Sequence, residues 1–303
     1  MMINGESMNA FDETAINKWK SYLLIFCFSL IIVALGYVFG KIYGGNNPSI
    51  IIFFMTIAFI IAVIMALISY FLGDKAALSI SGAYEANRRD HAHYINSVEG
   101  LAIAAQIPTP KIYVLPDEAI NAFATGRNPE TASIAVTEGA LKKLNRVELE
   151  GVIAHEMGHV KNYDMRLMTI TVILVGLIAL LSDFFLRGML FGGGDKDREM
   201  NPIFLIIGLV LAILAPIIAQ LIQLAISRKR EYAADATGAV LGRNPEALAN
   251  ALKKIKKDNI ETKHASKATA HMYFSNPLKE GFWNNMFSTH PPLDERIRRL
   301  EAM

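Results

Sequence analysis

The residues with the clearest chemical meaning form one short motif. Residues 155–159 read His-Glu-Met-Gly-His, which places two histidines four positions apart. In a helix, side chains at this spacing stand one above the other, so His155 and His159 can share one Zn²⁺ ion. Glu156 lies beside the first ligand and can take a proton from a water that the metal has acidified. We therefore expect one Zn²⁺ per chain, with Glu156 as its general base.

A third ligand is expected far along the chain. A catalytic zinc takes three protein ligands and keeps a fourth position open. Residues 231–235 read Glu-Tyr-Ala-Ala-Asp, so Glu231 and Asp235 share one helix face. We assign Glu231 to the metal and Asp235 to a hydrogen bond with the ring of His155, which fixes the tautomer of that ligand. Taken alone, this spacing is more typical of a solvated acidic pair.

The composition indicates a membrane protein. Hydrophobic residues make up 52% of the 303 residues and charged residues only 19%, which is more apolar content than a soluble core of this size absorbs. The formal net charge of +2 argues against a nucleic-acid partner. Cys27, the single cysteine, cannot form an internal disulfide and reads as a small apolar side chain. The polar N-terminal segment does not read as a cleaved signal peptide.

Four apolar runs have the length of a membrane span. Each has about twenty residues or more, enough to cross a hydrocarbon core of about 30 Å as a helix. The runs are Ser21–Gly40, Ile50–Leu72, Leu167–Leu186 and Pro202–Ile226. We expect four transmembrane helices in a mainly α protein. The zinc motif precedes the third run and Glu231 follows the fourth, so a helical hairpin would bring both to one face of the bilayer.

Basic residues predict the orientation of these helices. They precede the first run and follow the second and the fourth, which places both termini and the zinc site in the cytoplasm. These residues are Lys18, Lys20, Lys75, Arg88, Arg89, Arg228, Lys229 and Arg230. The expected division is a tail (1–20), two spans (21–72), the first part of a catalytic domain (73–166), two further spans (167–226) and its second part (227–303).

Both polar segments carry signals of regular structure. The first is expected to contain a helix over His91–Gln106 and a helix that Asn145 caps with Glu148. Its short β-like stretches are Lys111–Leu115, Asn121–Arg127 and Ala132–Thr137. The second segment is expected to be helical over Arg228–Gly242, from Pro245 onward, and again up to about Leu300.

Four motifs together resemble the HtpX family of bacterial membrane zinc metalloproteases, relatives of the CAAX prenyl proteases. The motifs lie at 155–159, 231–235, 121–126 and 288–292, and the resemblance covers nearly the whole chain. It implies an α+β, zincin-like domain of the gluzincin type on the cytoplasmic side of the plasma (inner) membrane. It also implies a stress-linked endopeptidase that degrades misfolded or damaged membrane proteins.

The resemblance implies two further roles. The segment beginning Asn121-Ala122-Phe123-Ala124 resembles an edge strand with which an extended substrate pairs, although an ordinary strand is an equal alternative. His290 resembles a family histidine that steadies the oxyanion, although a residue at a helix entry is an equal alternative.

The remaining candidates are weaker. His91, His93, His264 and His271 match no ligand pattern and are expected to be surface or structural residues. Asp164 could brace the ligand helix, but an exposed charge at the membrane surface is the preferred interpretation.

Several alternative functions remain. An intramembrane protease would hold its motif inside an apolar run, whereas charged residues surround this one. A dedicated CAAX-type processor would carry more spans, and a zinc hydrolase of another substrate class stays open. A transporter would show ionisable groups deep in its spans. A non-catalytic scaffold would have no need of Glu156.

Overall fold

The fold is known from a computed structural model. It describes residues 10–174, 176, 228–258, 260, 262, 265, 269–275 and 291–303. The predicted span Pro202–Ile226, most of the span Leu167–Leu186, and the residues His264 and His290 lie outside the described residues. Within them the chain is mostly helical, as predicted, and two helices are long and apolar enough to cross a membrane.

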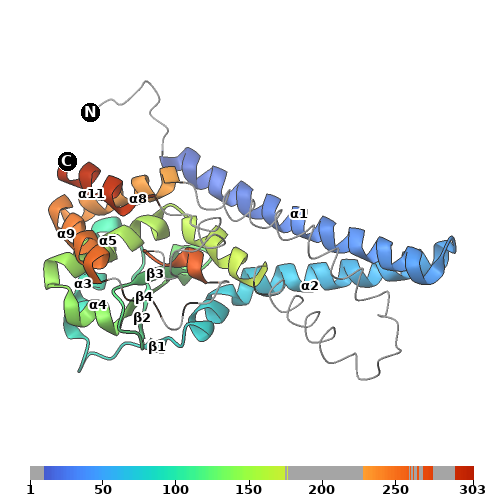
Figure 1. Cartoon of the computed structure of the whole chain (residues 1–303), viewed down its shortest axis with the longest axis horizontal. Coiled ribbons are helices and arrows are strands. Elements are labelled where there is room, and N and C mark those ends of the chain that lie inside the picture. The colour runs from blue at the N-terminus through green and yellow to red at the C-terminus, as the bar shows by residue number, and fades with distance from the viewer. Residues whose placement is uncertain are drawn as a thin grey trace, which may run out of the picture.

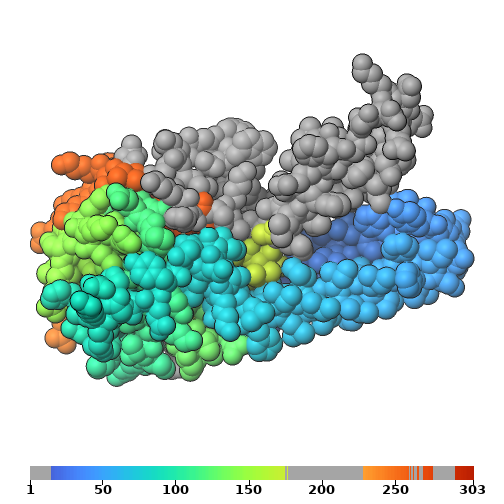
Figure 2. All heavy atoms as spheres, turned by 90° about the horizontal axis from the view of Figure 1, so that it is seen from below, coloured from blue at the N-terminus to red at the C-terminus, as the bar shows by residue number. Residues whose placement is uncertain are grey.

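These two helices form an antiparallel hairpin that projects from the rest of the molecule (Figure 1). They are α1 (Ala10–Gly44) and α2 (Pro48–Ile80), and they contain the first two predicted apolar runs. A Cβ atom on Gly40 would lie 2.7 Å from Cα of Ile51, so glycine allows the two backbones to approach closely. Seen from below, the hairpin leaves the domain as one extension (Figure 2).

The polar domain contains a four-stranded sheet with the order β1-β2-β4-β3. Its strands are β1 (Tyr84–Glu85), β2 (Lys111–Leu115), β3 (Ala122–Thr125) and β4 (Ser133–Thr137). The central strands β2 and β4 are parallel, and β1 and β3 add antiparallel at the two edges. The segments predicted to be β-like therefore form strands, and β3 is an edge strand.

Helices lie beside this sheet and on one another (Figure 1). They are α3 (Ala92–Ala105), α4 (Glu138–Lys143), α5 (Arg146–Lys161), α8 (Arg228–Gly242), α9 (Pro245–Asp258) and α11 (Leu293–Glu301), with short 3₁₀ turns η1 (Pro129–Thr131) and η2 (Ala270–Met272). The start of α5 is fixed by the predicted capping box, in which Glu148 N donates to Asn145 Oδ1 at 2.9 Å and Asn145 N donates to Glu148 Oε2 at 2.8 Å.

Two buried clusters hold the domain together. The larger one joins α3, α5 and α9 to the sheet through apolar side chains such as Val98, Ile153 and Leu252. The second one lies where the hairpin meets the domain and includes Leu24, Phe123 and Leu167. The hairpin is therefore packed against the domain, which lets residues of α1 and α2 influence the site described next.

Candidate metal centre

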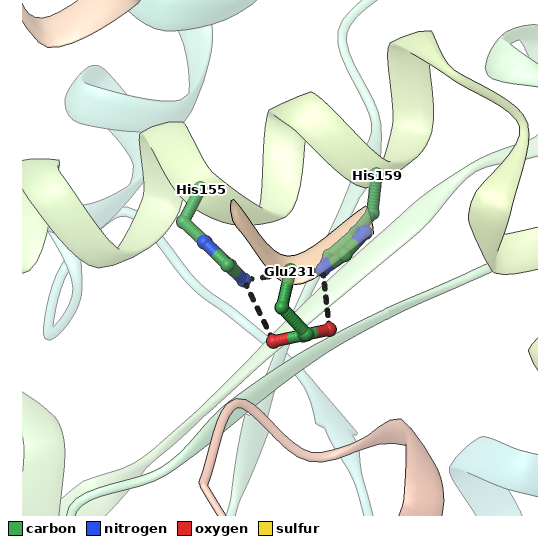
Figure 3. Close-up of side chains that lie close together, drawn as sticks. All are labelled: His155, His159 and Glu231. Carbon is green, nitrogen blue, oxygen red and sulfur yellow. Dashed lines mark hydrogen bonds and ion pairs between the residues drawn. The ribbon is translucent and has the colours of Figure 1, made fainter. Parts of the chain in front are cut away.

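Three side chains converge between α5 and α8. His155 and His159 project from α5, and Glu231 lies in the first turn of α8 (Figure 3). The two Nε2 atoms are 3.1 Å apart, and the carboxylate oxygens of Glu231 lie 3.5 Å from His159 Nε2 and 3.8 Å from His155 Nε2. The three possible ligand atoms all lie within 4.8 Å of one another and are buried. Two imidazoles and one carboxylate form a donor set that suits Zn²⁺.

The crossing of the two helices depends on glycine. A Cβ atom on Gly238 would lie only 2.9 Å from the backbone nitrogen of His155. On the other helix, a Cβ atom on Gly158 would lie 3.3 Å from Cα of Ala234. The small residues let α8 lie directly on α5, and this contact carries Glu231 to the two histidines.

The second ring nitrogen of His155 contacts a carboxylate. Its Nδ1 lies 2.9 Å from Oδ1 of Asp235, one turn after Glu231. Arg296 of α11 holds the same carboxylate at both oxygens, at 2.7 and 2.9 Å, and also donates to the carbonyl of Phe274 at 3.1 Å. Burial raises the pKa of Asp235, but the charge of Arg296 and the contact with His155 outweigh burial and lower it.

The second ring nitrogen of His159 contacts a different carboxylate. Its Nδ1 lies 3.2 Å from Oδ2 of Asp164, which is only 2% exposed. The expectation of an exposed charge at Asp164 was wrong. Tyr163 adopts a positive φ of 61°, and this turn directs the next residue back toward α5. Asn17 of α1 donates to Oδ1 of Asp164 at 2.7 Å and to the carbonyl of Asn162 at 2.9 Å.

The two imidazoles therefore differ in proton affinity. Burial lowers the pKa of His155 to about 4, although Asp235 opposes the shift. Burial also acts to lower the pKa of His159, but the hydrogen bond to Asp164 and the nearby negative charges raise it to about 9. In the absence of a metal, His155 is neutral near pH 7 and His159 holds a proton.

Glu156, the predicted general base, is buried. Its side chain is 1% exposed, and its Oε2 atom has no hydrogen-bond partner among the described residues. Burial raises the pKa of Glu156 to about 7, against the effects of His159 and of a hydrogen bond from the backbone of Ala124. A carboxyl group with this pKa can both accept and release a proton near neutral pH.

The predicted substrate strand, β3, lies beside the carboxylate of Glu156. The segment that contains Phe274 already covers part of the outer edge of β3. The carbonyl of Ala122 in β3 accepts a hydrogen bond from the backbone nitrogen of Phe274 at 2.8 Å. The side chain of Asn121 holds Ser275 through hydrogen bonds of 3.1 and 3.2 Å. Residues in antiparallel strands alternate in the direction of their backbone groups, so Ala122 and Ala124 both face this outer edge.

The structure thus brings together most of the predicted site residues. His155, Glu156, His159, Glu231 and Asp235 meet at one point, next to β3. His271 is buried, with Nε2 2.9 Å from the carbonyl of Met168, as suits a structural residue.

Sequence analysis missed two residues near the metal centre. Arg296 shares the apolar face of its helix with Leu293, Ile297 and Leu300, so that pattern held a signal of a buried cation. No comparable signal marked Asn17.

Comparison with known proteins places the chain in a family. The sequence profile of "Peptidase family M48" matches residues 89–303, well over half of the chain. The chain belongs to peptidase family M48. This M48 peptidase is 43% identical over 293 residues to the "Protease HtpX homolog" of Dictyoglomus thermophilum, covering 97% of this chain and 94% of that one. It is 46% identical over 298 residues to the "Protease HtpX homolog" of Caldanaerobacter subterraneus subsp. tengcongensis, covering 97% of each chain.

A solved structure shares the fold of the M48 peptidase. The crystal structure of S. mikatae Ste24p matches with a TM-score of 0.51 at 17% identity, covering 96% of this chain and 67% of that chain. The predicted resemblance to HtpX proteases is confirmed, and the M48 peptidase is a membrane metalloprotease.

Proposed function

We propose that this M48 peptidase is a zinc endopeptidase in which His155, His159 and Glu231 hold the ion and Glu156 is the general base. The convergence of three buried ligand atoms within 4.8 Å is the observation that supports this assignment most strongly. A zinc ion held there would supply Lewis acidity, which acidifies water and polarises a carbonyl. Three protein ligands would leave the fourth coordination position of a zinc ion open, as a catalytic site requires.

The protein groups perform the proton transfers. Glu156 accepts a proton from the attacking water and delivers it to the amine that leaves when the peptide bond breaks. Its pKa of about 7 suits both steps. Asp235 and Asp164 accept from Nδ1–H of the two imidazoles, which keeps each Nε2 free to face the ion. His290 would assist at the oxyanion, as the family resemblance implies.

The substrate would bind as a strand on the outer edge of β3. Residues Asn121 to Ala124 supply this edge, and Ala124 lies beside Glu156. Backbone pairing of this kind ignores most side chains, so it suits an enzyme that accepts many sequences. A substrate that extends past Ala122 must displace Phe274, because the backbone nitrogen of Phe274 already donates to the carbonyl of Ala122.

We place the active site on the cytoplasmic side of the bacterial inner membrane. The chain would have a tail (1–20), two pairs of spans (21–72 and 167–226) and a catalytic domain in two parts (73–166 and 227–303). The packing of α1 and α2 against the domain supports a site close to the bilayer. Its substrates would be damaged or misfolded membrane proteins, cut during stress. On a Cys27→Ala background, single cysteines near residues 100 and 260 should resist a membrane-impermeant thiol reagent while one near Asn46 reacts. The opposite pattern would overturn the orientation.

A dedicated processor of prenylated C-terminal peptides is the second candidate, because the fold is shared with Ste24p. A prenylated peptide cleaved far faster than unfolded casein would favour it.

The central test is metal analysis of the purified protein with casein as substrate. We expect about one zinc per chain, loss of cleavage with a chelator and recovery when zinc is restored. Glu156→Gln should keep the zinc and lose at least roughly a hundredfold in rate, as expected when a general base is removed. Wild-type cleavage by a zinc-loaded Glu156→Gln sample would refute the assignment of the base.

A further inference from the structure

A buried arginine lies outside the metal centre, at the base of the hairpin. Arg166 is 6% exposed and belongs to the helical stretch 164–174. Its Nη2 donates to the hydroxyl of Tyr70 at 2.8 Å. Its Nε and Nη1 atoms are buried, and neither has a hydrogen-bond partner among the described residues. A buried guanidinium with unused donors is costly unless an acceptor reaches it.

Aromatic rings and a second arginine surround this guanidinium. Arg166 lies 5.6 Å from the ring centre of Tyr22 and 5.2 Å from that of Tyr70. Arg127 reaches the same site and lies 5.6 Å from the ring of Tyr70 and 5.0 Å from the ring of Phe71. Within the described residues, no ion pair joins Arg127 or Arg166 to an acidic side chain. Among the residues that the structure describes, the two positive charges of the cluster thus have no counter-ion.

The cluster lies where apolar runs begin and end. Tyr22 stands at the start of the first run, Tyr70 near the end of the second, and Arg166 directly before the third. Tyr22 is 56% exposed and Phe71 is 54% exposed, so the rings at the outer side of the cluster lie on the surface of the hairpin. Tyrosines and arginines at the ends of spans lie at the level of the lipid headgroups.

We infer that Arg166, Arg127, Tyr70 and Tyr22 bind the phosphate group of an anionic phospholipid. Guanidinium and phosphate match in charge, and an unused N–H group can donate to a phosphate oxygen. The lipid phosphate would accept from the unused Nη1 of Arg166, and Arg127 would add a second charge from just beyond the end of β3. A lipid bound here would link the hairpin of α1 and α2 to the end of β3, the strand beside the metal centre.

The test measures the affinity of the full-length protein for phosphatidylglycerol in detergent, by native mass spectrometry. Arg166→Gln should weaken binding roughly ten- to a hundredfold, as expected for hydrogen bonds to a charged group. Lys75→Gln removes the same charge from α2 outside the aromatic cluster and should leave the affinity unchanged. Equal weakening by both variants would mean that only the general surface charge acts, and would overturn the site.

Further measurements distinguish a lipid site from a site for a soluble anion or for the substrate. Arg127 is half-buried, so Arg127→Gln should fold even if Arg166→Gln does not, and it should weaken lipid binding severalfold. An unchanged affinity in Arg127→Gln would contradict the inference. Inorganic phosphate that raises the melting temperature as much as the lipid does would instead indicate a soluble-anion site. A raised KM for peptides with a free C-terminus in Arg166→Gln, with lipid affinity intact, would indicate a substrate site.

None of these readouts except the last depends on catalysis. Lipid binding can therefore fail while the zinc assignment stands, and the reverse also holds.

Discussion

His155 and His159 lie at the same candidate metal site, but they contact different parts of the molecule. Asp235, which contacts His155, is held by Arg296 through two short hydrogen bonds. All three of these side chains come from domain helices. Asp164, which contacts His159, is held by Asn17 from the membrane-side helix α1, and Arg230 lies 3.5 Å away.

The two imidazoles therefore differ both in the charges around them and in the elements that hold them in position. Around His155 the carboxylate is neutralised inside the domain, and burial dominates the pKa of the ring. Around His159 the negative charges outweigh burial, and the ring holds a proton near pH 7 in the absence of a metal. The first imidazole is fixed by the fold of the domain. The second depends in addition on where α1 lies.

The largest expected effect comes from breaking the support of His155. Arg296→Met removes a fully buried cation and leaves Asp235 without its cationic partner. The free energy of unfolding should fall by about 3–5 kcal/mol, as found when one partner of a buried ion pair is removed. Chemical denaturation of the solubilised protein measures it. Arg299→Met, on the exposed side of α11, is the matched control, and a similar loss there would contradict the argument.

The support of His159 should be weaker. Asp164→Asn keeps the shape of the side chain but removes the negative charge near Nδ1. Zinc affinity should fall about 10–100-fold, the usual result of losing a carboxylate behind a ligand imidazole. Competition with a chromophoric chelator measures the dissociation constant. Because Asp235 is untouched, the free energy of unfolding of the metal-free protein should change less than in Arg296→Met.

The pH dependence of metal binding should report the same difference. Only the neutral imidazole binds zinc, and without metal the pKa of His159 is raised to about 9. The apparent affinity should therefore rise with pH, by about tenfold per unit between pH 7 and 9, and level off above. His155, with a pKa of about 4, contributes no slope in this range. In Asp164→Asn the plateau should begin at lower pH, because the negatively charged partner that raises the pKa of His159 is gone.

Local spacing explains which features could be predicted. The histidine pair, the capping box of α5 and the pairing of Glu231 with Asp235 on one face all follow from helical periodicity, so they were visible in the sequence. Strand β1 has two residues and forms only because Tyr84 and Glu85 pair with β2, so no local pattern marked it.

The support of His159 by Asp164 was only the weaker alternative in the sequence, because no local pattern marked the burial of this carboxylate. The burial of Asp164 depends on one positive φ at Tyr163, and its partner Asn17 is 147 positions away. Short-range patterns identify the ligands, whereas tertiary contacts decide what holds them.

The smallest expected effect, and the most direct test of the role of α1, comes from Asn17→Ala. The amide of Asn17 is 4% exposed and donates to both Asp164 and the carbonyl of Asn162. Arg230 remains near Asp164, so the loss should be partial, and zinc affinity should fall by about three- to tenfold. Ser21→Ala is the control, because its buried hydroxyl lies one turn further along α1 and bonds to the carbonyl of Asn17.

A double-mutant cycle distinguishes positioning from general destabilisation. If Asn17 acts through Asp164, then Asn17→Ala should have almost no further effect on zinc affinity in an Asp164→Asn background. Additive losses would mean that α1 influences the metal by another route, or only through stability. In that case His159 would be fixed by the domain alone, just as His155 is, and the contrast between the two imidazoles would reduce to their charge.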